Sequence, residues 1–173
     1  MFFILAQICG LIALVLTVIS VQFKTKEKIV MCSVLANIVV AIQYFLLSAL
    51  TGAVISVINA IRCLIFYVYK KKNMKPSILV LIIFEIVAII SGIISWQNAW
   101  SLIPIIVTVI YTYGLWQDNV TIIRITTGIV GFGWAIYNLV VMAYVGALQE
   151  TSQLISAIIA VYRNRNKKIK SMQ

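Results

Sequence analysis

Histidine is absent from this 173-residue sequence, and aspartate occurs only once, at Asp118. These absences exclude a histidine-based metal site, a Ser-His dyad and a pair of catalytic aspartates. Only 10% of the residues are charged, whereas about a quarter is usual for a soluble domain. We therefore expect a protein that is not an enzyme, has no metal or cofactor, and has little mass in water.

Cysteine is scarce as well, with Cys9, Cys32 and Cys63 all placed inside apolar segments. An odd number of buried thiols does not indicate a disulfide framework, so we interpret them as small hydrophobic side chains. No Lys or Arg precedes the first apolar stretch, although a secretory signal peptide needs positive charge there. We expect this stretch to remain as a helix.

Hydrophobic residues make up 63% of the chain, and its mean hydropathy is +1.09. A helix needs about 20 apolar residues to cross a bilayer, so the chain has room for roughly seven spans with short connections. We predict an all-α integral membrane protein. The predicted helices are Phe2–Gln22, Ile29–Ser48, Gly52–Tyr69, Ser77–Ser95, Ala99–Trp116, Thr121–Val145 and Ala147–Tyr162, with a tight turn at Val145-Gly146.

The net charge of +10 is concentrated in short basic clusters at residues 24–28, 70–75 and 163–170. These clusters lie between apolar runs and indicate topology and contact with lipid headgroups rather than nucleic acid. The connections at 49–51, 96–98 and 146 carry no Lys or Arg. The positive-inside rule then predicts a multi-pass membrane protein with its N-terminus outside and its C-terminus in the cytoplasm.

An internal repeat is indicated when the chain is shifted against itself by 94 residues. Gly52-Ala53 then aligns with Gly146-Ala147, and Ala41-Ile42 aligns with Ala135-Ile136. Each copy of the repeat has three helices, an odd number, so a second copy joined directly would be inverted in the membrane. The one unmatched helix between the copies restores the orientation and makes the two copies parallel. The predicted organisation is a first three-helix bundle at 1–70, a linker helix at 71–98, a second bundle at 99–163 and a basic cytoplasmic tail at 164–173.

The segment 20–26, Ser-Val-Gln-Phe-Lys-Thr-Lys, resembles the Pro-Gln turn and basic loop of the SWEET and PQ-loop transporter superfamily, with Val21 in place of the proline. Over nearly its whole length, at positions that include Gln7, Gly10, Asn59 and Arg62, the chain more closely resembles the YgjV-type bacterial inner-membrane proteins. This second resemblance implies a location in the bacterial cytoplasmic (inner) membrane. The first resemblance implies a SWEET-like arrangement of three, one and three helices. It also implies alternating access to a sugar or another small polar solute.

Polar residues inside the predicted helices are the candidate solute-binding groups, because polar side chains in hydrocarbon usually face a bundle interior or a cavity. Asn59 and Gln153 are partners in the repeat, and each lies about 10 Å from its outer turn at 1.5 Å per residue. SWEET sugar carriers place an asparagine pair on these two helices. The alternative is that such amides only hold helices together. Further candidates for the same polar site are Trp134, Asn138, Tyr44 and Gln43.

Arg62 and Glu85 lie at matching depth in neighbouring predicted helices, about 12 Å from the inner boundary. An isolated charge at such depth is costly, so we predict an ion pair, with a proton relay as the alternative. Gly10 and Pro104 match across the repeat and are candidate hinges. Glu150 is expected to open the last helix at the outer surface and to cap it.

Two functions fit these features. One is a facilitative or proton-linked carrier of a small solute, which alternates between two bundles. The other is a receptor or scaffold that does not transport, in which the polar residues serve only assembly. Assembly into a homo-oligomer stays open, as do the substrate, the direction of transport and ion coupling.

Overall fold

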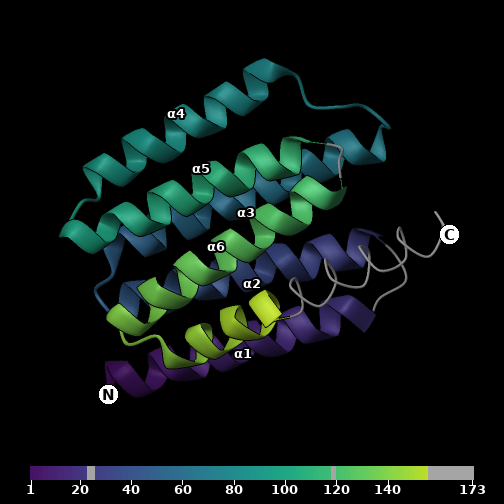
Figure 1. Cartoon of the computed structure of the whole chain (residues 1–173). Coiled ribbons are helices and arrows are strands. Elements are labelled where there is room, and N and C mark those ends of the chain that lie inside the picture. The colour runs from purple at the N-terminus through teal and green to yellow at the C-terminus, as the bar shows by residue number, and fades with distance from the viewer. Residues whose placement is uncertain (23–25, 118–119, 156–173) are drawn as a thin grey trace, which may run out of the picture.

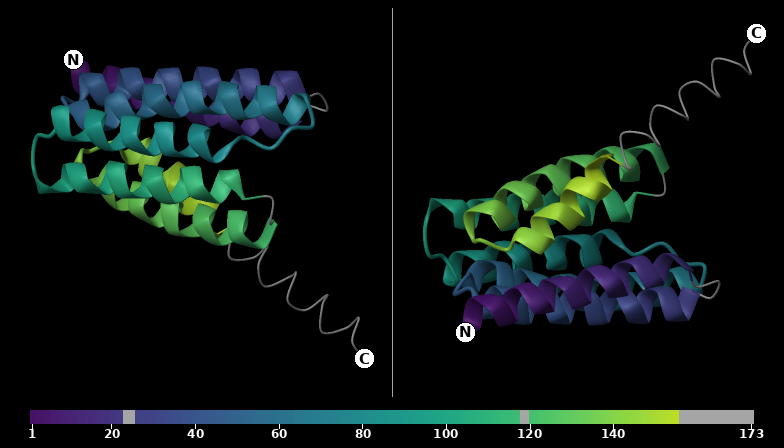
Figure 2. Two further views of the ribbon diagram at one scale, coloured as in Figure 1. Left: turned by 90° about the horizontal axis from the view of Figure 1, so that it is seen from above. Right: turned by 90° about the horizontal axis from the view of Figure 1, so that it is seen from below.

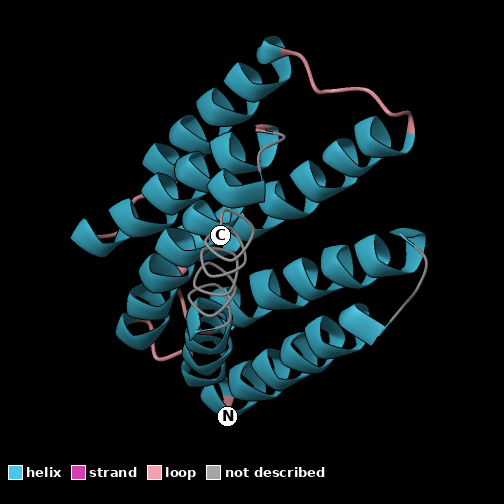
Figure 3. Cartoon of the chain, turned by 45° about the vertical axis from the view of Figure 1, so that its right-hand side comes forward, coloured by secondary structure: helices cyan, strands magenta, loops and turns pink. Residues whose placement is uncertain are grey.

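The computed structural model describes residues 1–22, 26–117 and 120–155, and all regular secondary structure in these ranges is helical (Figure 3). The chain is again helical at 144–155, where the described part ends. The basic tail at 164–173 lies outside the described residues. The bounded helices are α1 (Phe2–Gln22), α2 (Lys26–Leu46), α3 (Leu50–Lys71), α4 (Ile78–Ile94), the 3-10 helix η1 (Ala99–Ser101), α5 (Leu102–Trp116) and α6 (Val120–Val140).

Helix ends follow turn-forming residues where the sequence has them. After α3, Asn73 adopts a left-handed φ of 51°, and the N–H of Met74 returns to the carbonyl of Tyr69 at 3.0 Å. Asparagine tolerates this conformation, and Pro76 then keeps the chain from continuing as a helix. These residues explain why α3 and α4 are separated where the composition predicts a break.

The end of α6 differs from the predicted one. Helix α6 stops at Val140, and the turn comprises residues 141–143, so Val145-Gly146 lies inside the next helix. Met142 has a left-handed φ of 61°, and the Ala143 N–H bonds to the Asn138 carbonyl at 2.8 Å. The turn residues are apolar and include neither glycine nor proline, so nothing in the local sequence marks this break.

The same turn occurs 94 residues earlier, between α2 and α3. Ser48 has a φ of 56°, and the Ala49 N–H bonds to the Tyr44 carbonyl at 2.8 Å. The end of α3 at Asn73 has the same geometry, which is a common way for a helix to end, so the informative point is that Ser48 and Met142 are 94 residues apart. The sequence repeat therefore has a structural counterpart at these two turns.

The described helices lie roughly along one direction, as Figures 1 and 2 show. Helix α2 packs between α1 and α3, α5 packs on α6, and α4 contacts both α3 and α5. The 144–155 segment lies beside α1, where the Gln7 side chain donates to the Met142 carbonyl at 2.6 Å and Gln149 donates to Thr17 Oγ1 at 3.4 Å. Segments distant in sequence thus come together around the centre.

Large apolar side chains cover the outside of these helices; examples are Phe45 and Leu79. By length and composition, three helices are sufficient to cross a membrane, at Phe2–Ile19, Leu50–Tyr69 and Ala99–Trp116, and three shorter described helices are apolar as well. Helix α4 buries only a narrow seam at Leu81, Phe84, Ala88 and Gly92. Such an exterior suits lipid rather than water.

Candidate functional site

A cavity of about 250 Å³ lies at the centre of the described helices. Its walls come from α1, α2, α3, α5, α6 and the 144–155 segment. Most of the lining residues form pairs separated by 94 positions. The pairs are Thr17 with Tyr111, Ser33 with Thr127, Ala36 with Val130, Asn37 with Gly131, Val40 with Trp134, Ser56 with Glu150, and Asn59 with Gln153.

This pairing places the cavity where the two copies of the repeat face each other. A pocket at an arbitrary place in the structure would draw unrelated residues from the two halves, whereas here equivalent positions contribute to opposite walls. The paired residues are not identical, so the two walls differ in chemistry. One wall offers Ser56 and Asn59, and the other offers Glu150 and Gln153.

Arg62 on α3 is the most deeply buried charged side chain in the described part of the chain, at 2% exposure, and it lines the cavity. Its Nη1 donates to Thr112 Oγ1 at 2.7 Å and to the Thr108 carbonyl at 3.5 Å, both on α5. The guanidinium also lies 4.9 Å from the centre of the Tyr111 ring, a cation–π distance. All these partners are uncharged, and Nε has no hydrogen-bond partner.

Asn59 lies one turn from Arg62 on the same helix and is also buried, at 8% exposure. Its Oδ1 has no hydrogen-bond partner. A buried polar atom without a partner costs free energy, so native proteins keep few of them. Asn59 and Arg62 therefore present unused hydrogen-bonding capacity beside a cavity.

Glu150 does not open the last helix, contrary to the sequence-based expectation. Helical structure begins at residue 144, so Glu150 lies in its second turn, and its side chain lines the cavity rather than capping an end. Opposite it, α6 has Gly131, where an added Cβ would lie 3.5 Å from the Glu150 carbonyl oxygen. An alanine would make ordinary van der Waals contact there, so α6 and this helix pack at a normal distance.

An aromatic layer, which we define as Tyr44, Trp134 and Tyr137, borders the cavity, and Tyr44 and Trp134 form part of its lining. Tyr44 stacks on Trp134 with ring centres 5.9 Å apart, and Tyr137 meets both rings edge-on at 5.7 Å. Tyr44 donates to Asn138 Oδ1 at 2.6 Å, and Tyr137 Oη accepts from the Gly52 N–H at 3.1 Å. These bonds join α2 and α3 to α6 near the 47–49 and 141–143 turns.

The predicted solute-binding residues are only partly brought together. Asn59, Gln153, Trp134 and Tyr44 line the cavity. Asn138 is buried behind Tyr44 as its hydrogen-bond partner. Gln43 is buried toward α1, where its Nε2 has no partner and its side chain leaves no room for a Cβ at Gly10.

Arg62 and Glu85 make no hydrogen bond to each other, although both lie in the described part of the chain. Arg62 reaches α5 instead, and Glu85 Oε2 on α4 has no partner. The sequence argument matched the two residues by depth alone. It could not foresee that α5 offers hydroxyl and carbonyl oxygens to the guanidinium.

Neither candidate hinge interrupts its helix. Helix α1 continues through Gly10 from Phe2 to Gln22. Pro104 is the third residue of α5, in the first turn, where a missing N–H removes no intrahelical bond. Hinge motion at either position stays a prediction.

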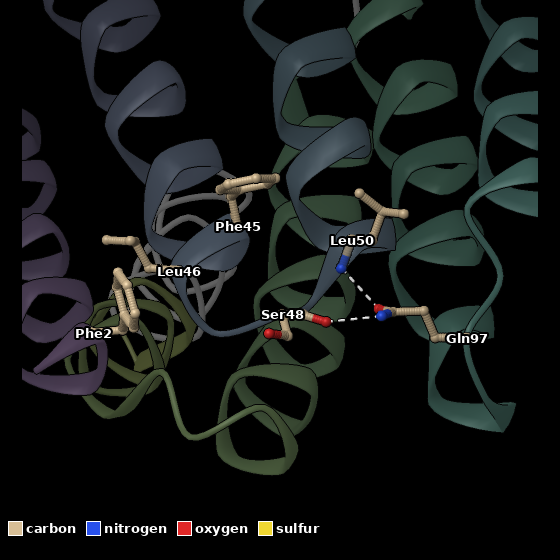
Figure 4. A pocket seen from close by; sticks show the side chains of 6 residues that line it. All are labelled: Phe2, Phe45, Leu46, Ser48, Leu50 and Gln97. Atoms are coloured by element: carbon tan, nitrogen blue, oxygen red, sulfur yellow. Dashed lines mark hydrogen bonds between the residues drawn. The ribbon is translucent and has the colours of Figure 1, made fainter.

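A second hollow, of about 430 Å³, lies near the N-terminus of α3 and is shown in Figure 4. Phe2, Phe45 and Leu46 contribute most of its surface, and its polar group, Gln97, is already engaged. Gln97 accepts from the Leu50 N–H at 2.7 Å and donates to the Ser48 carbonyl at 2.8 Å. We therefore interpret it as an apolar surface groove and not as the site.

Some functional candidates were missed from the sequence. Tyr137 and Tyr111 were not singled out, and the pairing of Ser56 with Glu150 was overlooked. The 94-residue repeat could have revealed them, because each polar residue can be examined together with the residue 94 positions away in the other copy. Within the described residues, no group of three or more His, Cys, Asp or Glu side chains is arranged to hold a metal ion.

Residues 4–168 match the Imp-YgjV family, described as a bacterial inner membrane protein. No curated protein and no solved structure matches the chain.

Proposed function

Because the chain belongs to the Imp-YgjV family of bacterial inner membrane proteins, we propose that it carries a small polar solute across that membrane by alternating access. The central cavity is the observation that supports this proposal. Its lining combines buried polar groups, unused hydrogen-bonding atoms and matched positions from both copies of the repeat. A protein whose polar residues served only assembly would have no need to leave Asn59 Oδ1 and Arg62 Nε without partners.

The carrier needs two parts that can move relative to each other. We propose that these are a first three-helix bundle, α1 to α3, and a second formed by α5, α6 and the last helix, with α4 as the linker. The equivalent left-handed turns at Ser48 and Met142 support this SWEET-like arrangement of three, one and three helices. The aromatic layer then acts as a closed gate on the side of these turns, while the cavity extends to Thr17 and Ser33 in the other half.

The orientation in the membrane is testable by cysteine labelling. We expect Lys72 and Lys167 to face the cytoplasm and Asn98 to face the periplasm, because the basic clusters favour the inner side. Single cysteines are introduced at these positions after the three native cysteines have been replaced. An impermeant maleimide should then label position 98 in intact cells, and positions 72 and 167 only after lysis. Labelling of position 72 in intact cells would overturn the topology.

Binding at the cavity is tested with Asn59→Leu and Gln153→Leu. Each change removes a hydrogen-bonding group from the cavity wall, so affinity for the solute should fall at least tenfold, or about 1.4 kcal/mol. Stability should change little, because Asn59 Oδ1 has no partner to lose. The measurement is ligand-induced thermal stabilisation of purified protein in a screen of small solutes, followed by uptake into vesicles for the solutes that bind.

Gln97→Leu is the matched control, because this amide is engaged far from the cavity. It should lower stability through loss of its bonds to Leu50 and Ser48, and leave binding unchanged. The receptor or scaffold alternative predicts that Asn59→Leu and Gln153→Leu behave like this control. It also predicts that no small solute stabilises the protein or is taken up.

A further inference from the structure

Two side chains of opposite charge line the one cavity, and they come from opposite walls. Arg62 belongs to α3, and Glu150 belongs to the 144–155 helix. The repeat makes Ser56 the equivalent of Glu150, and Ser56 precedes Arg62 by six residues, or about 9 Å along a helix. The two charges thus come from different helices, one in each copy of the repeat.

The packing of the helices does not satisfy Arg62 completely. A charge inside a membrane protein is costly, and a purely structural Arg62 would be expected to form an ion pair with a carboxylate. Its hydrogen-bond and ring partners are neutral, and although Glu85 on α4 interacts with Arg62 electrostatically, it makes no hydrogen bond to the guanidinium, and Nε is unused. Its neighbour Asn59 has an unused Oδ1 as well. The α3 wall therefore has a net positive charge facing a space that a ligand can enter.

The opposite wall complements it. Glu150 lies between Gln149 and the cavity residue Gln153, and Tyr44 and Trp134 lie on the adjoining side of the cavity. A carboxylate flanked by amide and aromatic groups suits a primary or quaternary ammonium. A neutral sugar would instead displace water from Arg62 and Glu150 without offering either side chain an opposite charge. The loss of hydration would then be uncompensated, which is unfavourable in a buried site.

We propose that the solute is a small zwitterion of the amino-acid class, whose carboxylate is bound by Arg62 and whose cationic group is bound by Glu150. This inference rests on the proposed carrier function and narrows its substrate. Asn59 and Gln153 then hydrogen-bond the two ends of the solute from their respective walls. The cavity volume of about 250 Å³ limits the solute to a small molecule.

The test uses purified full-length protein and four sets of probes: free amino acids with glycine betaine, amino-acid amides, N-acetyl amino acids, and hexoses. Binding is measured as thermal stabilisation at increasing probe concentration. At least one zwitterion should bind, and its affinity should fall at least tenfold when the carboxylate becomes an amide or the amine is acetylated, because each change removes a charge-assisted hydrogen bond.

Variants assign the two ends of the solute. In Arg62→Met the preference for the acid over its amide should disappear, and in Glu150→Gln the preference for the free amine over its acetylated form should disappear. Persistence of both preferences in these variants would overturn the assignment. If a variant fails to fold, the four probe sets on the unaltered protein still decide the solute class.

Two further outcomes distinguish failure of the amino-acid assignment from failure of the proposed carrier function. Binding or uptake of hexoses without any zwitterion would contradict the amino-acid class and leave the carrier function standing. If no probe binds and no probe is taken up, the carrier function itself fails.

Discussion

Replacing Arg62 by methionine is expected to raise the stability of the purified protein and to abolish binding of a carboxylate-bearing solute. Placing a lone arginine at the centre of a membrane helix costs about 2.5 to 3.5 kcal/mol on insertion scales, whereas a hydrogen bond between membrane helices contributes about 0.6 kcal/mol on average. Loss of the bond to Thr112 is therefore the smaller term. Loss of the cation–π contact with Tyr111, which contributes about 0.5 to 2 kcal/mol, reduces the gain, so the net stabilisation should be about 1 kcal/mol, measured by thermal or denaturant unfolding in detergent.

Thr112→Val is the control of opposite sign, because it keeps the charge and removes its closest acceptor. It should lower stability. If Arg62→Met were destabilising instead, Arg62 would be a structural residue whose contacts with Thr112 and Tyr111 sustain the fold.

The same measurement tests the ion pair expected from the sequence. Arg62 bonds to α5, and Glu85 interacts with it electrostatically but without a hydrogen bond, so the effects of Arg62→Met and Glu85→Gln should be nearly additive. A double variant that recovered stability lost in the single variants would restore the ion-pair hypothesis.

Replacing Gly52 by alanine is expected to destabilise the described conformation by about 1 to 3 kcal/mol, the usual cost of overfilling a packed site. An added Cβ would lie 2.8 Å from Tyr137 Cε1 and 3.1 Å from Tyr44 Cδ2, both in the aromatic layer. In a carrier, this steric crowding would favour conformations in which the three rings of the aromatic layer have moved apart. The measurement is thermal unfolding, together with the reactivity toward a soluble maleimide of a single cysteine introduced at Val40, which lines the cavity one turn from Tyr44.

Gly131→Ala is the matched control for Gly52→Ala. Both glycines are helical, but at Gly131 the nearest atom to an added Cβ is 3.5 Å away, which is ordinary contact. Alanine is the better helix former by about 1 kcal/mol, so this variant should be neutral or more stable. Equal destabilisation in both variants would mean that the tight contact at Gly52 is not what limits substitution there.

Much of the fold follows from where apolar runs and turn residues lie. Helix α1 has the predicted bounds, and Asn73 and Pro76 separate α3 from α4 as their chemistry requires. The end of α6 could not be predicted, because Met142 adopts its left-handed conformation without any local signal. Only comparison with Ser48 across the repeat would have indicated it.

Part of the candidate site could also be predicted, because the repeat pairs equivalent positions. The repeat brought Asn59 and Gln153 to notice as partners, and both line the cavity. Depth matching failed to predict the surroundings of Arg62, because depth does not say which helix a long side chain will reach. Glu150 was misplaced through the error in the helix boundary, and this error hid the negatively charged wall of the cavity.

The aromatic layer has a consequence for the energetics of the cell. An inner membrane stores a proton gradient, and a polar cavity in a membrane protein is a route by which that gradient could leak. Tyr44 stacks on Trp134 and Tyr137 meets both rings edge-on, while the Tyr44 hydroxyl donates to Asn138 and the Tyr137 hydroxyl oxygen accepts from the Gly52 N–H. As the proposed closed gate, such a layer would interrupt proton hopping, so a carrier of this design would hold a polar cavity in the bilayer without dissipating the gradient.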